Sequence, residues 1–218
     1  SFFALVDANG FILPLTTAQD HKKIGEGDTG LNTGGMGAYS PVPFIKQNQI
    51  NDFVIKFVKP VIDDLKNNNI FFSGVFYAGL ILTKDGPKLL EINVRFGDPE
   101  VQAVLPRLKA DLLGLLLASS KGRLDQLKFP EWDNDFCINV VMASKGYPES
   151  YEKNTIISDL NKITVDKSQY IFHSSTKKNE DHWLATGGRV LSISALGSTL
   201  KEARNKAYNV INKIDWKS

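Results

Sequence analysis

A segment that alternates between apolar and polar side chains, and then breaks into a rigid turn, constrains this chain more than any other feature. Successive side chains of a β-strand point to opposite faces, so we expect Glu91, Asn93 and Arg95 to share one face. The apolar residues between them are Leu90, Ile92 and Val94. These are predicted to face a core, which leaves the polar face for a site.

The chemistry of the polar residues indicates a site for a metal ion and phosphate. Carboxylate and carboxamide oxygens bind hard cations, and a guanidinium binds phosphoryl oxygens. Residues two apart on a strand lie about 7 Å apart, which suits Glu91 and Asn93 if both reach such cations. The same alternation is also typical of any half-buried strand. The turn at 97–100 favours a site, because Asp98 and Glu100 add two carboxylates where loops often carry chemistry.

Composition excludes several classes of protein. With 218 residues, 42% hydrophobic and 23% charged, the chain can bury a core in one large or two small domains. The net charge of +2 and the lack of a basic run argue against a nucleic-acid partner. No apolar stretch is long enough to predict a membrane span or membrane partner. The single cysteine, Cys137, fits a reducing compartment, so we expect a cytoplasmic protein with a buried, unreactive thiol.

The chain opens on a predicted β-hairpin, with strands 2–6 and 11–15 around an Asp-Ala-Asn-Gly turn. Because residue 1 is Ser and a strand begins at once, we expect further residues to precede this chain in the natural protein. The strand 74–82 is predicted to turn back into the strand that carries Glu91, as an antiparallel pair. The glycine-rich stretch 16–40 is predicted to be a mobile linker or a binding loop.

Two amphipathic helices are predicted from apolar residues at three- and four-residue steps. One covers 50–65 with a possible kink at Pro60, and the other covers 100–119 with Pro106 disturbing its register. A stretch of mixed polarity follows the second helix, and we place a domain boundary there. The predicted domains are 1–122 and 132–218.

The second predicted domain contains strands near 136–142, 170–173 and 189–195. A final helix is predicted to begin after Thr199, because Glu202 follows three residues later as in a capping box. Strands and helices are segregated along the chain, so the fold class is α+β.

Five segments of the sequence together resemble one known family. They are Gln19–Lys23, Gly27–Pro41, Arg95–Gln102, Phe172–Thr176 and Thr186–Leu191. In this order and spacing they are similar to the glycinamide ribonucleotide synthetase (phosphoribosylamine–glycine ligase) family, purine-biosynthesis enzymes of the ATP-grasp superfamily. The resemblance runs along essentially the whole chain, but it covers only the C-terminal half of the family's polypeptide.

This resemblance implies a fold and a partner. The implied fold is the C-terminal part of an ATP-grasp domain, an antiparallel sheet with helices, followed by a small, β-rich α+β domain. The implied partner is the missing N-terminal half, which in this family carries a Rossmann-like domain, a lid and the strand that grips adenine.

The resemblance also implies an activity, in which ATP, glycine and 5-phosphoribosylamine give ADP, phosphate and glycinamide ribonucleotide through a glycyl phosphate. Glu91 and Asn93 would hold Mg²⁺ or Mn²⁺, and Arg95 and Asp98 would act on the reacting groups. The implied cofactor- and substrate-binding residues are Asp20, Lys22, Lys23, Asn32, Thr33, Gly34, Gly35 and Gly37.

Several alternatives stay open at this point. Asp98 suits a helix start as well as a site, and the glycine-rich segment suits a disordered loop as well as an anion cradle. Arg189, after two glycines, either closes over the site or ties two domains together. For the whole protein, the alternatives are a carboxylase-type ATP-grasp enzyme that uses bicarbonate and a non-catalytic remnant. The Asn-Thr-Gly-Gly-Met-Gly segment argues against the carboxylase.

Overall fold

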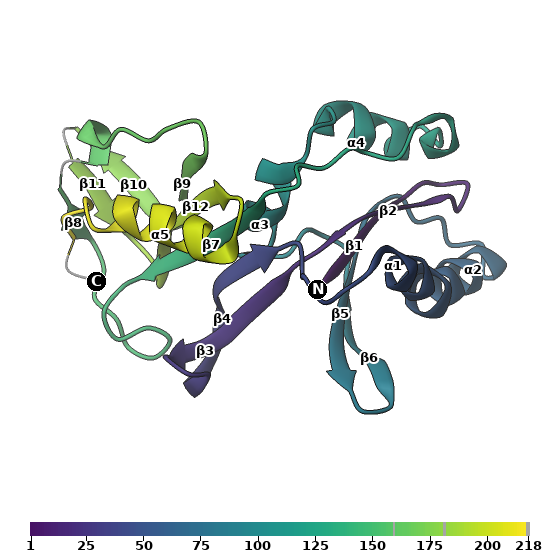
Figure 1. Cartoon of the computed structure of the whole chain (residues 1–218), viewed down its shortest axis with the longest axis horizontal. Coiled ribbons are helices and arrows are strands. Elements are labelled where there is room, and N and C mark those ends of the chain that lie inside the picture. The colour runs from purple at the N-terminus through teal and green to yellow at the C-terminus, as the bar shows by residue number, and fades with distance from the viewer. Residues whose placement is uncertain (159, 181, 217–218) are drawn as a thin grey trace. The chain divides into compact units, whose positions relative to one another are not determined.

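The computed structural model describes residues 1–158, 160–180 and 182–216, and the chain forms two compact units (Figure 1). The first unit consists of Ser1–Ala18, Pro41–Gly97 and Leu108–Asp133. The second consists of Gln19–Ser40, Asp98–Arg107 and Asn134–Ser218. The chain therefore passes between the units several times, whereas the predicted domains 1–122 and 132–218 follow the order of the sequence. That division stays a prediction.

The first unit contains a four-stranded antiparallel sheet. Its order is β2 (Ile12–Thr17), β1 (Phe2–Val6), β5 (Gly74–Thr83) and β6 (Gly86–Asn93). Both predicted hairpins are confirmed. The first turn closes because the Asp7 carboxylate accepts backbone N–H hydrogen bonds from two residues of the turn, each at 3.0 Å.

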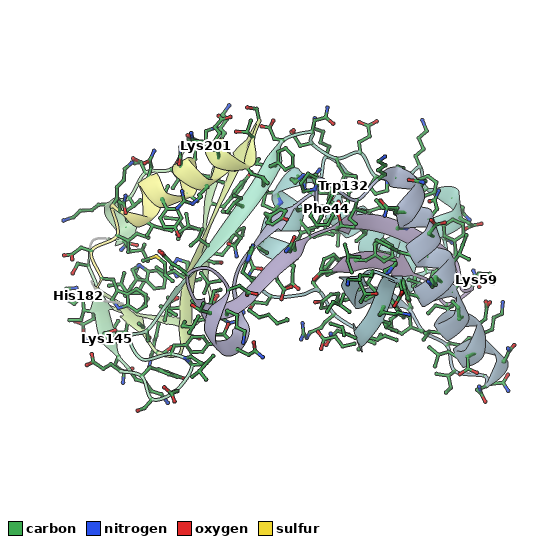
Figure 2. The ribbon with its side chains drawn as sticks, turned by 60° about the horizontal axis from the view of Figure 1, so that its bottom comes forward. Phe44, Lys59, Trp132, Lys145, His182 and Lys201 are labelled. Atoms are coloured by element: carbon green, nitrogen blue, oxygen red, sulfur yellow. The ribbon has the colours of Figure 1, made fainter. Side chains whose placement is uncertain are left out.

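One face of this sheet is covered by α1 (Gln47–Phe53), the π-helical segment η1 (Val54–Val58) and α2 (Lys59–Asn67). These elements confirm the predicted helix 50–65. Pro60 lies within the continuous helical stretch formed by these three elements, just after the π-helical segment, and having no N–H it cannot donate to the preceding turn. The buried cluster beneath consists of Phe2, Ala4, Val6, Phe53, Phe57, Val58, Ile62, Phe76 and Ala78. Lys59 lies on the exposed side (Figure 2).

The predicted helix over 100–119 is wrong as a single element. The segment forms α3 (Val101–Val104), a 3₁₀ turn (Leu105–Arg107) and α4 (Leu112–Ser120). Pro106 has no N–H to continue the helix, and the Asp111 carboxylate then caps α4 by accepting backbone hydrogen bonds at 3.2 and 2.9 Å. A further 3₁₀ turn follows at Leu124–Gln126.

The prediction that Leu90, Ile92 and Val94 face a core is also wrong. Their exposed fractions are 66%, 39% and 71%, respectively. The strand β6 is the edge of its sheet, its pairing with β5 is irregular at Leu90, and it ends at Asn93. Among the described residues, the burial of the β6 side chains therefore does not alternate from one residue to the next as the sequence pattern predicted.

The second unit is built on a five-stranded antiparallel sheet. Its order is β3 (Gln19–Gly25), β4 (Thr29–Ser40), β7 (Phe136–Ala143), β12 (Arg189–Gly197) and β9 (Gln169–His173). The last three confirm the predicted strands. The first two correct the prediction of a linker or loop, because the glycine-rich stretch is a hairpin whose second strand continues the sheet.

Several smaller elements complete the second unit. The sequence did not predict a three-stranded sheet of β10 (Thr176–Asn179), β11 (His182–Ala185) and β8 (Thr155–Ile157), or a 3₁₀ turn at Leu160–Lys162. The predicted final helix is confirmed as α5 (Leu200–Ile211), which lies against β7 and β12 (Figure 1). No helix among the described residues is long and apolar enough to cross a membrane.

Candidate functional site

The predicted metal ligands lie on one strand of the first unit. Glu91 and Asn93 are both on β6 and are paired in register with Gly79 and Tyr77 of β5. A Cβ on Gly79 would lie 2.8 Å from the Cγ of Glu91. The missing side chain of Gly79 therefore leaves the space that the Glu91 side chain occupies.

These two residues fit a magnesium ion that keeps other ligands. Mg²⁺ prefers oxygen ligands in octahedral geometry and usually retains several waters beside one or two protein groups and substrate phosphates. The described residues contain no cluster of three or more His, Cys, Asp or Glu that could hold a metal. Glu91 and Asn93 would thus supply two oxygen ligands, and phosphate and water the others.

The third predicted residue of this face, Arg95, lies beyond the end of β6 and is exposed. Its Nη1 donates a hydrogen bond of 2.8 Å to the backbone carbonyl of Phe96. The strand alternation therefore does not extend to Arg95, and its predicted role on the reacting groups stays a prediction.

The predicted binding residues of the β3–β4 hairpin belong to the second unit and contact one another. Lys22 pairs with Asp20 at 2.7 Å, and the Thr33 hydroxyl donates to the Lys22 carbonyl at 2.7 Å. Lys23 Nζ donates to the Gly30 carbonyl at 3.2 Å. The charges that the sequence offered as substrate contacts thus form an ion pair and a hydrogen bond within the hairpin itself.

The glycines of β4 have packing roles that the sequence did not reveal. The Gly34 N–H donates to the Tyr147 hydroxyl at 3.1 Å, and the Gly35 N–H donates to the Thr33 hydroxyl at 3.0 Å. A Cβ on Gly37 would lie 2.8 Å from the Asn139 carbonyl oxygen in β7. Two N–H groups that were expected to face an anion therefore donate within the protein. Asn32, earlier in β4, is exposed, and the anion role of this segment stays a prediction.

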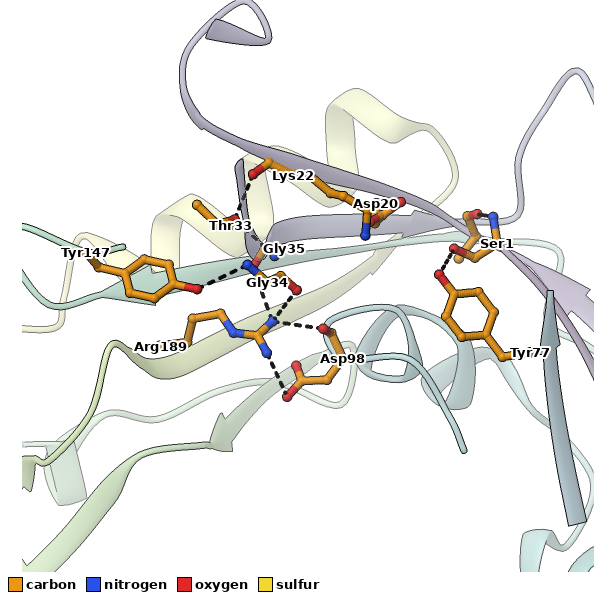
Figure 3. A network of polar contacts seen from close by, with 11 residues as sticks. Ser1, Asp20, Lys22, Thr33, Gly34, Gly35, Tyr77, Asp98, Tyr147 and Arg189 are labelled. Atoms are coloured by element: carbon orange, nitrogen blue, oxygen red, sulfur yellow. Dashed lines mark hydrogen bonds and ion pairs between the residues drawn. The ribbon is translucent and has the colours of Figure 1, made fainter. Parts of the chain in front are cut away.

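Arg189, at the start of β12, connects these glycines with Asp98 (Figure 3). Its Nη1 donates to the carbonyls of Gly34 at 2.8 Å, Gly35 at 3.3 Å and Asp98 at 2.8 Å. Its Nη2 lies 3.6 Å from the Asp98 carboxylate. A planar guanidinium suits this arrangement because its donors point in fixed directions. The sequence marked Arg189 only through the two glycines before it and left its role open.

Buried polar groups hold the turn that contains Asp98. Asn139 Nδ2 donates to the Pro99 carbonyl at 3.3 Å, and the Ser194 hydroxyl donates to Asn139 Oδ1 at 2.9 Å. Both side chains are almost fully buried, so these hydrogen bonds are costly to lose. The nearby Cys137 is free and buried, as predicted, and burial raises the pKa of its thiol to about 12. It is therefore protonated near neutral pH and unsuited as a nucleophile.

The matching family models and the curated relatives named below agree on one family. The family model described as "Phosphoribosylglycinamide synthetase, ATP-grasp (A) domain" matches residues 1–101, and the model for the C domain of the same synthetase matches residues 137–218. The chain is 45% identical over 218 residues to the phosphoribosylamine–glycine ligase of Agrobacterium fabrum, covering 100% of this chain and 51% of the relative. The chain thus spans about half the length of most curated relatives that it matches.

Two further relatives extend this result. The phosphoribosylamine–glycine ligase of Vigna unguiculata is 45% identical over 220 residues, covering 99% of this chain and 70% of the relative. The crystal structure of the same ligase from Thermotoga maritima superimposes with a TM-score of 0.83 at 28% identity, covering 99% of this chain and 52% of that one. Sequence and fold therefore point to the same relatives.

Proposed function

Because the chain belongs to the phosphoribosylamine–glycine ligase family, we propose that it serves the ATP-dependent ligation of glycine to 5-phosphoribosylamine. The products are glycinamide ribonucleotide, ADP and phosphate. A carboxylate is a poor electrophile, so the glycine carboxylate first takes the γ-phosphoryl group of ATP. The ribosylamine nitrogen then attacks the glycyl phosphate, the C–N bond forms, and phosphate leaves with the C–O electron pair.

The observation that carries this proposal is the placement of Glu91 and Asn93 on one strand, with Gly79 opposite Glu91. In the proposed enzyme these two side chains hold Mg²⁺, or Mn²⁺, against the phosphates of ATP. Such an ion, when bound, neutralises charge on the phosphates and orients them for in-line transfer. Reactions of this type depend mainly on positioning and on charge neutralisation.

Two further residues have proposed roles in the same reaction. Arg95, exposed after β6, steadies the transferred phosphoryl group or the acyl phosphate. Asp98 orients the glycine substrate or its ammonium group. Substrate binding in the proposal involves the hairpin residues Asp20, Lys22, Lys23, Asn32, Thr33, Gly34, Gly35 and Gly37.

The proposal also covers the partner and the location. The chain covers 51% of the Agrobacterium fabrum ligase, so we propose that the activity requires the family's N-terminal half. The single cysteine supports the proposed cytoplasmic location.

Substitution of the metal ligands tests the function. In the complete native polypeptide, we expect Glu91→Gln and Asn93→Leu each to lower ATP-dependent formation of glycinamide ribonucleotide by at least about 100-fold. We also expect both to weaken Mn²⁺ binding in the presence of ATP, followed by electron paramagnetic resonance. Lys88→Gln, an exposed change on the same strand, is the control and should leave both readouts unchanged.

Product formation at the wild-type rate in Glu91→Gln would refute the metal assignment. ATP turnover that depends on bicarbonate and not on glycine would favour the carboxylase alternative. If this chain, mixed with the family's N-terminal half, restored no activity, the non-catalytic alternative would be favoured.

A further inference from the structure

Two buried polar side chains face each other across the central strands of the second unit. Asn139 on β7 and Ser194 on β12 are paired in register, and they are 1% and 0% exposed. On the opposite face of the same sheet, Ile193 belongs to an apolar cluster that packs under α5. A buried polar side chain is costly unless it is hydrogen-bonded, so the contacts of this pair indicate what it holds in place.

Asn139 binds the backbone of the turn that contains Asp98. Its Nδ2 donates to the Pro99 carbonyl at 3.3 Å. The carbonyls on either side are also bound, because the Asp98 carbonyl accepts from Arg189 at 2.8 Å and the Glu100 carbonyl accepts the first hydrogen bonds of α3 at 2.9 and 3.0 Å. Three successive carbonyls thus have donors, which fixes the direction of the chain through the turn.

Ser194 reaches the same turn by a second route. Its hydroxyl lies 2.7 Å from the Gln102 carbonyl and 2.9 Å from Asn139 Oδ1, and its single proton is donated to one of these acceptors at a time. Gln102 Nε2 in turn donates to Asp98 Oδ1 at 2.9 Å. Ser194 therefore holds the backbone of the residue whose side chain binds the Asp98 carboxylate.

The Asp98 carboxylate, unlike the groups that hold it, is open to solutes. Its side chain is 48% exposed and lines, with Gln102 and Arg189, a polar cavity of about 380 Å³ within the second unit (Figure 3). A group that orients a substrate must keep its place closely, because a misplacement of about 1 Å costs about 100-fold in rate. The buried hydrogen bonds behind the turn supply this restraint on an otherwise exposed carboxylate.

We propose that Asn139 and Ser194 are positioning residues of the ligation reaction, which fix the Asp98 turn and thereby aim its carboxylate at the ammonium group of glycine. Both side chains are closed to solvent, so neither touches a substrate. The inference rests on the proposed function for the role of Asp98. An apolar pair would fill the same space without the cost of burying polar groups, so what the polar pair adds is the fixed direction of the turn.

The test uses steady-state kinetics of the complete native polypeptide, with glycine and ATP varied separately. We expect Ser194→Ala and Asn139→Leu each to raise the KM for glycine by about tenfold and to change the KM for ATP by less than about twofold. Ile193→Val is the control, because it removes a buried methyl group from the opposite face of the same strand. It should lower the melting temperature and leave the KM for glycine unchanged.

A double substitution tests whether Ser194 acts through Asp98. Asp98→Asn should itself raise the KM for glycine, because a neutral carboxamide attracts an ammonium group less than a carboxylate does. In that background, Ser194→Ala should raise the KM for glycine by less than about twofold, since the carboxylate that the hydroxyl positions is gone.

Three outcomes overturn the proposal. They are an unchanged KM for glycine in Ser194→Ala, an equal rise in the KM for ATP, or a full tenfold further rise when Ser194→Ala is added to Asp98→Asn. If Asn139→Leu fails to fold by circular dichroism, Ser194→Ala alone decides. An unchanged KM for glycine in Asp98→Asn would refute the role of Asp98 and this proposal with it. Wild-type protein that forms no glycinamide ribonucleotide would refute the proposed function itself.

Discussion

Three glycines leave space for neighbouring groups that an added side chain would contact. They are Gly34, Gly35 and Gly79. A Cβ on Gly34 would lie 3.2 Å from the Arg189 guanidinium carbon, and one on Gly35 would strike the ring of Pro99. A Cβ on Gly79 would press on Glu91. At the residue scale, the lack of a side chain at each glycine leaves the space that a neighbouring group occupies. These groups are the Arg189 guanidinium, the Pro99 ring and the Glu91 side chain.

Gly35 offers the sharpest test, since it has a φ of +113° as well as the contact with Pro99. We expect Gly35→Ala to lower the free energy of unfolding by about 3 kcal/mol, because backbone strain adds to displacement of the proline. Urea unfolding measures this. Gly86→Ala is the matched control, because Gly86 has a φ of +93° and no atom within 4 Å of the added Cβ.

For that control we expect a loss of about 1 kcal/mol, from backbone strain alone. Equal losses in the two variants would show that Pro99 yields without cost, and that Gly35 is needed only for its backbone conformation.

At the scale of single elements, α5 begins with a well-defined set of caps. The Thr199 hydroxyl accepts from the Glu202 N–H at 3.1 Å, as the capping-box prediction required. The Glu202 carboxylate, however, accepts from the Ser198 N–H and hydroxyl at 2.9 and 2.6 Å, and pairs with Lys206 at 2.9 Å. These hydrogen bonds lower the pKa of Glu202 to about 2.

A lowered carboxyl pKa gives stability that is present above the ordinary value near 4.5 and lost as the pH falls toward 2. We therefore expect Glu202→Gln to lower the melting temperature slightly at pH 7 and to flatten its fall between pH 4.5 and pH 2. Thermal unfolding across this pH range measures both effects. Glu26→Gln, an exposed change in the β3–β4 turn, should leave the acid profile unaltered, and a parallel profile in Glu202→Gln would contradict the assignment.

At the scale of the whole molecule, the second unit gathers three separated segments of the chain, and Arg107 links them. Arg107 is 5% exposed. Its Nε donates to the Asp135 carbonyl at 2.8 Å, and its Nη1 donates to the Ser40 hydroxyl at 2.9 Å. The end of the 98–107 segment is thereby fixed to the end of β4 and to the residue before β7.

We expect Arg107→Met to lower the free energy of unfolding by roughly 3 kcal/mol, because it removes two hydrogen bonds that a buried guanidinium donates. Arg107→Lys should recover only part of this, since an ammonium cannot reproduce the guanidinium geometry. Arg204→Met on the exposed side of α5 is the control and should cost less than about 1 kcal/mol. A similar loss in both variants would show that the buried hydrogen bonds of Arg107 contribute nothing particular.

Local patterns were sufficient for many of the elements. The turn residues from Asp7 to Gly10 predicted the first hairpin, the apolar spacing predicted the helix that covers the first sheet, and Thr199 predicted the start of α5. These features depend on groups within a few residues of one another, so the sequence alone determined them. The placement of Glu91 and Asn93 on one strand also followed from the local pattern, and their role as metal ligands stays a prediction.

Other features depend on residues far apart in the chain, and only the tertiary structure decided them. Nothing local marks the 16–40 stretch as a hairpin, because its second strand is stabilised by pairing with β7, about a hundred residues later. The contacts of Arg189 with Gly34 and Asp98, and the cavity beside Gln102, likewise join distant segments. Such hydrogen bonds and close contacts form only where the folded backbone brings distant residues together. The spacing of apolar residues within a short segment does not determine which distant residues meet.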